Sequence, residues 1–519
     1  MRRPPTPGTA NRTRGTAHRR RAPAAGALSA ALFVALALAA PGAEAHVGSP
    51  DAVSDGRAGP YHLLATIRPP DVTPGVAHIE IRSVDGDVAR LTVVPLPMRG
   101  PGVSSPPTAD VARRSAEDPN LYRSSLWLMQ TGAWQVRITA TGARGEGVLS
   151  IPVPALSRGV RPMSRVLGGL LVALLGLLVL GIVSIVGASV REGDLDAGAV
   201  PDARRRARGR VAMVVTAAVV AAAIFGMNGW WTDEARLYRR LVYKPLRAEV
   251  ERPTPDALTL ALVDPGWLRW RRTDDLVPDH GHLLHLFAVR APGLDAVAHL
   301  HPSRDGDGRF SQALPPIPAG AYRLFGDVVH KSGLDETVSA TLALDARPPP
   351  LAASRFDPDD ASAEIPRAAT AAAPSFAFPD GSGRLRWVDP RPPRAGETVA
   401  LELEAEDAAG RPVDGLEPYM GMAGHAMIVA RDFSVFAHVH PTGSVPMAAL
   451  ALVDPAAVVD HAHHAGMTFA PRVRFPYVFP RPGSYRLFVQ IKRSGRIETA
   501  AYDVDVLDVA PAAAGSAGR

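Results

Sequence analysis

Short runs of alternating apolar and polar residues fill most of the chain outside its centre. In residues 46–158, runs such as Tyr61 to Ile67 and Trp134 to Ala140 are separated by turn signals such as Pro74-Gly75. A period of two over such short runs is typical of half-buried β-strands. Because six or more of these runs fit into about a hundred residues, the segment predicts a β-sandwich.

The same pattern returns twice in the second half of the chain. Residues 256–345 and 383–508 each contain six or seven strand-like runs, and the Pro/Ala/Asp-rich stretch 346–382 between them is typical of a linker. Residues 509–519 are mostly residues with small side chains, and this composition predicts a disordered tail. We therefore predict a mainly β protein with three Ig-like β-sandwich domains.

Two long uncharged apolar segments interrupt this pattern, at residues 166–190 and 211–229. Each is long enough, as a helix, to cross a hydrocarbon core of ~30 Å. The arginine-rich stretch 191–210 between them is expected in the cytoplasm under the positive-inside rule. The two segments thus predict a two-helix transmembrane hairpin between the first and second sandwich. A buried soluble helix is the alternative for the second, Ala-rich segment.

Residues 230–255 follow the second apolar segment and begin with Trp230 and Trp231. Apolar residues then recur with helical spacing among arginines until Pro245. This pattern favours a short amphipathic helix on the membrane surface. Neither apolar segment carries an ionisable residue, which argues for an anchor in the lipid bilayer and against an ion pathway.

Residues 1–45 have the order of a secretory signal peptide. A basic start precedes an Ala/Leu run and the cleavage signal Ala43-Glu44-Ala45. An uncleaved anchor is the alternative, because the apolar run is near the lower limit for spanning. Cleavage would make His46 the first residue, and its α-amine and imidazole could then chelate Cu(II). Together with the hairpin, the signal peptide puts the N- and C-terminal domains on the extracytoplasmic side of the cell membrane.

Composition narrows the chemistry. The 519 residues contain no cysteine, which excludes disulfides, thiol catalysis and thiolate metal sites. The net charge is +6, but the arginines cluster at the N-terminus and around the apolar segments. Membrane topology accounts for that clustering, so we expect no nucleic-acid partner.

The last two predicted domains share an internal tandem repeat. Ala298-His299-Leu300-His301-Pro302 returns as Ala437-His438-Val439-His440-Pro441. The tetrapeptide Tyr322-Arg323-Leu324-Phe325 returns downstream as Tyr485-Arg486-Leu487-Phe488. Two related domains are therefore built around histidine-rich strands.

Each repeat offers three histidines to one place. His299 and His301 are two residues apart, so a strand points both to one face. His285 precedes them by one hairpin and can lie on the neighbouring strand. The equivalent residues of the second repeat are His425, His438 and His440. Three converging imidazoles suit copper or zinc, and the alternative is a set of hydrogen-bonded structural histidines at strand ends.

The second repeat adds further ligand types. Met420 and Met422 precede His425, and an insertion after His440 contains His461, His463 and His464. Thioether sulfur selects Cu(I), so this mixture favours copper over zinc. The first repeat has a set of harder potential metal ligands at the corresponding place, namely Asp279, His280 and His282.

Both repeats resemble a known group of domains. The second repeat is similar to the YtkA-like and CopC-like exported bacterial Ig-like domains at Met420 to Met427, Phe436 to Pro441 and Pro482 to Phe488. The first repeat resembles the same group at His285-Leu286-Phe287 and His299-Leu300-His301-Pro302. The resemblance covers residues 256–508. It implies β-sandwiches outside the membrane and a role in copper handling or respiratory-oxidase maturation. His46 also resembles the mature amino terminus of CopC-like carriers, although the domain after it does not otherwise match.

These observations lead to one hypothesis and two rivals. We predict a non-enzymatic, membrane-anchored, exported protein that binds Cu(I) or Cu(II) and exchanges it with a copper-donating or copper-accepting protein. The first rival is a structural or partner-binding protein whose histidines only order strand ends. The second is an oxidative copper enzyme using His46, which ranks last because no catalytic acid or nucleophile can be identified.

Overall fold

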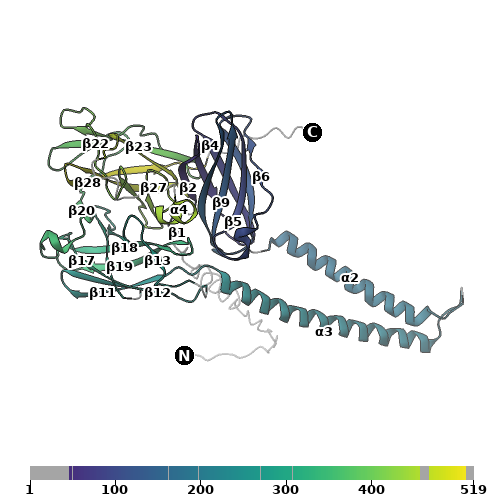
Figure 1. The fold of residues 1–519 in the computed structure, drawn as a ribbon. Helices are drawn as coiled ribbons and strands as arrows, with labels where there is room; N and C mark the ends of the chain where they lie inside the picture. The colour runs from purple at the N-terminus through teal and green to yellow at the C-terminus, as the bar shows by residue number, and fades with distance from the viewer. Residues whose placement is uncertain are drawn as a thin grey trace, which may run out of the picture. The chain divides into compact units, whose positions relative to one another are not determined.

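The computed structural model describes residues 46–48, 51–161, 163–196, 198–268, 271–306, 308–455 and 467–509. The predicted signal peptide, the side chain of His46 and nearly all of the predicted tail lie outside the described residues. So do His461, His463 and His464. The rest is mainly β, with strands in several sheets and two long helices between the β-domains, as predicted (Figure 1).

The first domain is a sandwich of two antiparallel sheets. Burial alternates along its strands, as in Gly75–Ser83, because one face of each strand covers the core and the other faces outward. One sheet has the order β2 (Ala52–Ala58), β3 (Tyr61–Arg68), β4 (Gly75–Ser83), β8 (Leu121–Leu128) and β7 (Arg113–Arg114). The other has the order β10 (Gly145–Ala155), β9 (Gly132–Gly142), β5 (Val88–Pro97) and β6 (Asp110–Val111).

The first repeat is one continuous path of hydrogen-bonded strands that folds around its own core. In chain order these are β11 (Arg247–Thr254), β12 (Ala257–Val263), β13 (Leu276–Val277), β14 (His285–Ala291), β15 (Ala296–Leu300), β16 (Ser303–Gly306), β17 (Arg309–Ala313), β18 (Gly320–His330), β19 (Asp335–Leu344) and β20 (Ala361–Glu364). The strand order is β16-β17-β12-β11-β19-β18-β14-β15-β20, and β13 pairs with β18.

The second repeat forms two sheets. One has the order β21 (Ser375–Ala377), β22 (Gly383–Trp387), β23 (Thr398–Asp407) and β26 (Arg472–Val478). The other has the order β1 (His46–Val47), β25 (Val435–Val439), β24 (His425–Ala430), β27 (Gly483–Arg493) and β28 (Arg496–Val506). The short helix α4 (Met447–Val453) lies between β25 and β26 and packs beside the first domain.

The predicted linker 346–382 is not free of structure. Its segment β20 pairs with β15, and its segment β21 pairs with β22. Each of these pairings extends a sheet by one strand and satisfies the backbone groups of an edge. The connection between the repeats is therefore built into both of them.

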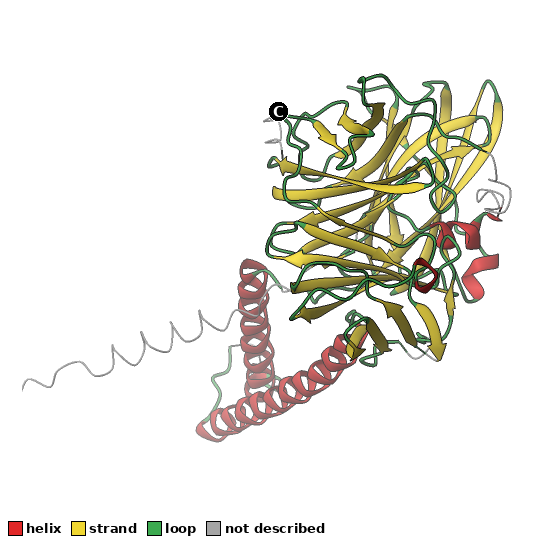
Figure 2. Cartoon of the chain, turned by 90° about the vertical axis from the view of Figure 1, so that its left-hand side faces the viewer, coloured by secondary structure: helices red, strands yellow, loops and turns green. Residues whose placement is uncertain are grey.

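Helices α2 (Arg165–Glu192) and α3 (Ala203–Leu241) meet near the turn that connects them and diverge towards the β-domains, and both are long and apolar enough to cross a membrane (Figures 1 and 2). They approach closely at two glycines: a Cβ on Gly209 would lie 3.1 Å from the carbonyl oxygen of Gly187. Small residues at such a crossing let two helix backbones come together.

The structure differs from the expectation at both ends of α3. The helix begins at Ala203, inside the predicted loop 191–210, where Asp202 caps it by accepting a hydrogen bond from the Arg205 backbone. It then continues past Trp231 to Leu241 with no separate surface helix. No proline interrupts the helical pattern before Pro245, so the helix has no reason to stop at the end of the apolar segment. The remainder of the predicted surface segment is strand β11.

Candidate metal centre

The strands that carry the predicted histidines are buried on both faces. Along β14, Leu286 and Ala288 belong to the core of the first repeat, whereas Phe287 and Val289 belong to a second apolar cluster. The second cluster also holds Phe436 and other residues from the second repeat. Each repeat therefore packs this sheet against its own core on one side and against the other repeat on the other side.

The period of two places the histidines on the shared face. His285 has the parity of Phe287, and His299 and His301 have the parity of Val297. The second repeat follows the same rule, with His425 in phase with Met427, and with His438 and His440 in phase with Phe436. Both triads consequently face the boundary between the repeats.

The structure brings each predicted triad together at a strand end. Nδ1 of His285 lies 3.2 Å from Nε2 of His299, and one ring nitrogen from each of His285, His299 and His301 lies within 4.8 Å of the others. In the second repeat, Nδ1 of His425 lies 3.2 Å from Nε2 of His438. The ring centroid of His440 is 4.4 Å from that of His438 and 5.1 Å from that of His425.

Hydrogen-bond partners set the tautomers in the first repeat. Nε2 of His285 lies 3.0 Å from the backbone carbonyl oxygen of Asp279, so this nitrogen carries the proton and donates. Nδ1 of His299 lies 2.9 Å from Oε1 of Gln490, whose amide nitrogen donates to the hydroxyl of Thr499. The proton of His299 is therefore on Nδ1. The two nitrogens that face each other both carry lone pairs.

The second repeat repeats this arrangement. Nε2 of His425 lies 3.2 Å from the carbonyl oxygen of Tyr419, and Nδ1 of His438 lies 3.5 Å from a carboxylate oxygen of Asp327. The carbonyl of Tyr419 holds the proton of His425 on Nε2 and leaves a lone pair on Nδ1, while the charge of Asp327 attracts the proton of His438 to Nδ1 and leaves a lone pair on Nε2. Asp327 and Gln490 occupy equivalent positions, opposite His285 and His425, and each serves a histidine of the other repeat.

Two lone pairs that face each other at 3.2 Å repel unless a cation lies between them. Two nitrogens that bind one ion at 2.0–2.1 Å in a tetrahedral site are themselves separated by ~3.3 Å. Metal-bound histidines usually donate their second ring proton to a carbonyl or carboxylate, which fixes the ring. The observed spacing and the outer acceptors both fit a metal site in each repeat.

The protonation of these rings agrees with that fit. Burial, with a smaller contribution from neighbouring histidines, lowers the pKa of His285 to about 3. Burial and the neighbouring rings also lower the pKa values of four more buried histidines well below the ordinary histidine value; these are His299, His301, His425 and His440. These five rings are therefore neutral near pH 7, which is the form that binds a metal.

Several buried ring nitrogens still lack a partner. Within the described residues, neither ring nitrogen of His440 has a hydrogen-bond partner, although the residue is only 2% exposed. Nδ1 of His301 lies 3.1 Å from a carboxylate oxygen of Asp360, and its Nε2 has no partner. A buried polar atom without a hydrogen bond is costly, so these nitrogens are suited to binding an ion or a water molecule.

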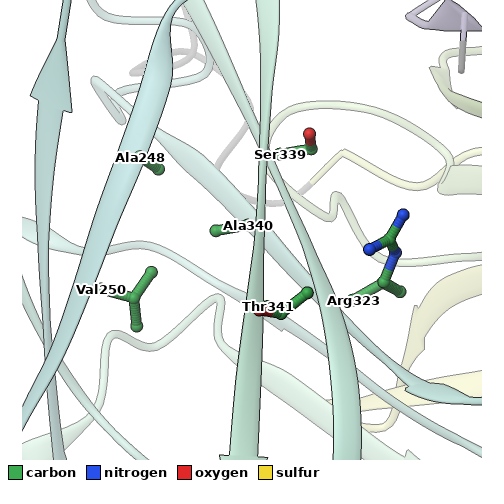
Figure 3. A pocket seen from close by; sticks show the side chains of 6 residues that line it. All are labelled: Ala248, Val250, Arg323, Ser339, Ala340 and Thr341. Atoms are coloured by element: carbon green, nitrogen blue, oxygen red, sulfur yellow. The ribbon is translucent and has the colours of Figure 1, made fainter. Parts of the chain in front are cut away.

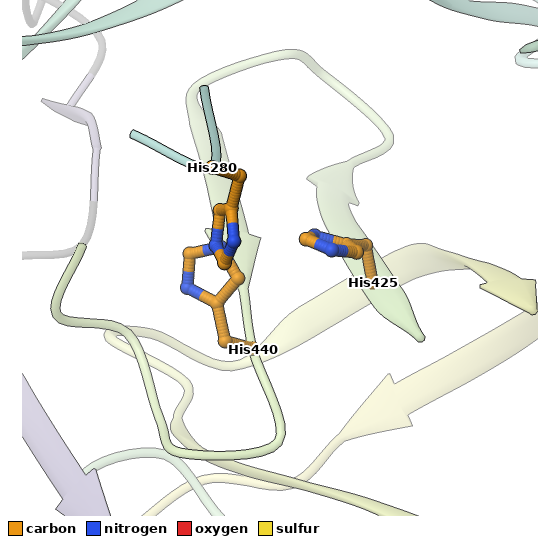
Figure 4. Close-up of side chains that lie close together, drawn as sticks. All are labelled: His280, His425 and His440. Atoms are coloured by element: carbon orange, nitrogen blue, oxygen red, sulfur yellow. The ribbon is translucent and has the colours of Figure 1, made fainter. Parts of the chain in front are cut away.

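The sequence did not predict that the two triads meet. The ring centroid of His438 is 5.5 Å from that of His285 and 5.5 Å from that of His299. His280 of the first repeat lies against His425 and His440 of the second, and these three could hold one ion (Figure 4). The ring centroid of His282 lies 4.0 Å from that of His301. Together with Asp357, His282 extends the histidine cluster towards its half-buried edge.

A signal for His280 was present in the sequence. His280 in Asp279-His280-Gly281-His282 stands five residues before His285, as Met420 in Tyr419-Met420-Gly421-Met422 stands five residues before His425. Both segments form the same turn, with φ of 50° at His280 and at Met420. The alignment of the repeats would have identified His280 as the counterpart of a predicted ligand.

The other predicted ligands have different positions. Met420 is buried in the turn beside the centre, whereas Met422 belongs to an apolar cluster with residues of the first domain. Met427, next to His425 in the sequence pattern, fills the boundary between the repeats as a core methionine. The backbone of His46 pairs with Val435 at the start of β25, at the opposite end of that strand from His438 and His440.

One other depression lies between β11 and β19 of the first repeat (Figure 3). These strands are paired only through Arg247 and Ser339 and then diverge. The depression is lined by Ala248, Val250, Arg323, Ser339, Ala340 and Thr341. This lining contains no histidine or carboxylate, so the histidine cluster is the stronger candidate site.

Comparisons with known proteins describe the chain only in part. Residues 383–508 match the family described as "Domain of unknown function (DUF8832)". None of the curated proteins matches the chain.

Among solved structures, native E. coli alpha-2-macroglobulin is similar at 10% identity, over 90% of this chain and 24% of its own, with a TM-score of 0.19. The chain thus spans about a quarter of that protein. The ICAM-5 D1–D4 ectodomain fragment is similar at 10% identity, over 86% of this chain and 77% of its own, with a TM-score of 0.15.

Proposed function

We propose that the protein is a membrane-anchored, extracytoplasmic copper-binding protein that holds or transfers copper at the boundary of its two repeats. The observation that carries this proposal is the pair of opposed ring nitrogens in each repeat, His285 with His299 and His425 with His438, each 3.2 Å apart. Outer acceptors turn all four lone pairs inward, which is the arrangement a metal ion requires.

Copper is favoured over zinc by the ligand set. Neutral imidazole binds both oxidation states of copper and also zinc. The buried Met420 lies in the turn before His425, and thioether sulfur is a soft ligand that selects Cu(I). With no cysteine in the chain, histidine and methionine are the soft and borderline ligands that remain. Zinc is the alternative that direct competition between the two metals would reveal.

A role in holding or passing copper is favoured over catalysis by the position of the ligands. The histidines nearest the boundary are buried, which suits retention of an ion. His282 and Asp357 are half-buried and adjoin His301, so they offer a path along which ligands could be exchanged with a donor or acceptor protein. A copper-exchanging partner protein and the lipid bilayer are the proposed interaction partners.

Metal binding should be measured on the full chain in detergent, because the second repeat shares an apolar cluster with the first domain. Cu(I), Cu(II) and Zn(II) are titrated against chelators of known affinity. The double variant His299→Gln/His438→Gln should lose tight copper binding. The variant His78→Gln, at an exposed histidine of the first domain, is the matched control and should bind as the wild type does.

The result also separates copper binding from a purely structural role. If the wild type binds no copper tightly and the double variant only loses stability, the histidines order the strand ends and the proposal fails. If zinc displaces copper at equal free concentration, the protein is a zinc protein.

The proposed topology has its own test, since a chain without cysteine allows single cysteines to be introduced cleanly. Ala408→Cys lies on the exposed surface of the second repeat, and Ala199→Cys lies between α2 and α3. A thiol reagent that cannot cross membranes should label Ala408→Cys in intact cells, and Ala199→Cys only after permeabilisation. The opposite pattern would place the repeats in the cytoplasm.

A further inference from the structure

His280 is the ligand that crosses from one repeat to the other. Its ring centroid lies 5.0 Å from that of His425 and 4.9 Å from that of His440. One ring nitrogen from each of these three residues lies within 4.8 Å of the others. All three residues are buried. An ion bound here would therefore be held by side chains from both repeats.

The turn that carries His280 is fixed from both sides. The carbonyl oxygen of Asp279 accepts a hydrogen bond from Nε2 of His285 in the first repeat. Its carboxylate accepts one, at 2.7 Å, from the backbone N–H of Ala448 in α4 of the second repeat. These bonds do not depend on a metal, so His280 is held in position before an ion arrives, which lowers the entropic cost of binding.

The ligands divide into two groups of different size. His285, His299 and His301 all come from the first repeat and supply three nitrogens. His280 joins His425 and His440 in a set of three, and Nε2 of His438 lies 3.2 Å from Nδ1 of His425, so a fourth imidazole adjoins this set. Structural sites for tetrahedral ions are closed by four protein ligands, whereas sites that exchange or react keep three and leave one position open.

We propose, resting on the proposed function, that the centre binds two metal ions with different roles. The ion held by His280, His425, His438 and His440 is a closed, structural ion that clamps the two repeats together. The ion held by His285, His299 and His301 has an open position and is the exchangeable one, next to the half-buried His282. Because His299 and His438 lie 5.5 Å apart between ring centroids, the two ions form a dinuclear centre.

The test is a Cu(II) titration of the full-length protein in detergent, with metal content and electron paramagnetic resonance measured at each step. The wild type should bind two ions in two steps. Two Cu(II) ions this close should broaden each other's spectrum at the second step.

The informative variant is His280→Asn, since asparagine tolerates the positive φ of 50° at this position. This variant should weaken the tighter copper-binding step at least tenfold and leave the weaker step unchanged. It should also remove the spectral broadening that the wild type shows at its second binding step. His280→Met is the second variant if His280→Asn misfolds, because Met420 occupies the equivalent position with the same φ. His78→Asn is the control and should leave both steps unchanged.

The outcomes separate the two proposals. If the wild type binds one ion only, or if His280→Asn and His280→Met leave both steps unchanged, the two-ion clamp is wrong while copper binding stands. If the wild type binds no Cu(II) and no Cu(I), both the clamp and the proposed function are wrong.

Discussion

Nε2 of His299 faces Nδ1 of His285 at 3.2 Å, and its own proton points away, towards the side-chain oxygen of Gln490 in the other repeat. The hydroxyl of Tyr419 also lies 3.4 Å from that outer nitrogen, while it donates its proton to the carbonyl of Asp359. Both neighbours therefore accept from His299. The second repeat thus controls which nitrogen of a first-repeat histidine is available for a metal.

Replacing Gln490 with leucine should weaken the site of the first repeat. The variant removes the main acceptor of the His299 proton, so the ring is free to rotate or to change its tautomer. Loss of such an outer partner costs 10–100-fold in metal affinity in other proteins, and we expect a loss of that order here. Chelator competition with Cu(II), resolved into its binding steps, measures it.

Gln490→Glu is the matched control. It keeps an acceptor oxygen at this position, and the first repeat already has a carboxylate, Asp327, at the equivalent place. Glutamate should therefore retain most of the affinity that leucine loses. Equal losses in the two variants would show that Gln490 acts through packing and not through the tautomer of His299.

The sequence was sufficient for the strands and for each triad, because both follow from a period of two. His299 and His301 share a face on any strand, and a hairpin brings His285 beside them. The two long helices followed equally from uninterrupted apolar length. Each of these features depends on a short stretch of chain, so the residues of that stretch are enough to predict it.

The meeting of the triads could not be predicted in the same way. The runs from His285 to Val289 and from His425 to Val429 are apolar at nearly every position, which indicates strands covered on both faces. Nothing in that pattern says which surface covers the second face. The answer depends on shape, in particular on Phe436 of one repeat stacking on Phe325 of the other. His280 lies beside His425 and His440 only because the two repeats are in contact.

The variant Phe436→Ala should loosen the boundary between the repeats. Phe436 is fully buried, and its ring lies 4.2 Å from that of Phe325 at an interplanar angle of 7°. Loss of a buried phenylalanine typically lowers the free energy of unfolding by ~3–5 kcal/mol. We also expect a weaker tight step of copper binding, because His280 would no longer be held against His425. Chemical denaturation and copper titration measure the two effects.

Phe310→Ala provides the comparison. Phe310 is equally buried but lies in an apolar cluster within the first repeat. It should destabilise the protein by a similar amount and leave the tight copper step intact. If both variants weaken that step equally, metal affinity follows overall stability, and the boundary has no special role.

Bound copper should stabilise the folded protein against heat. An ion that binds only the folded state adds ~2.7 kcal/mol at a free concentration one hundred times its dissociation constant. Thermal unfolding of the metal-free and copper-loaded protein measures this gain. The His280→Asn variant should gain less than the wild type at equal copper concentration. A gain that is the same in both would contradict a bridging role for His280.

A buried ionic cluster outside the metal centre gives a separate prediction on pH. His330 lies between Asp275, 2.7 Å from Nδ1, and Glu336, 3.1 Å from Nε2; Glu336 also accepts hydrogen bonds from Arg271 and Tyr243. Burial alone would lower the pKa of His330, but the hydrogen bonds to the two carboxylates outweigh it and raise the pKa above its ordinary value. The protonated ring is thus favoured in the folded state.

A raised pKa in the folded state gives a stabilising contribution that is complete below the unfolded value of ~6.5 and is lost as the pH rises through the folded value. The free energy of unfolding of the metal-free protein should therefore decrease from pH 6 towards pH 9 more steeply in the wild type than in His330→Gln. Urea denaturation at fixed ionic strength in the presence of a chelator measures both slopes. Parallel slopes would mean that His330 is neutral in the folded protein and that Asp275 and Glu336 do not hold its proton.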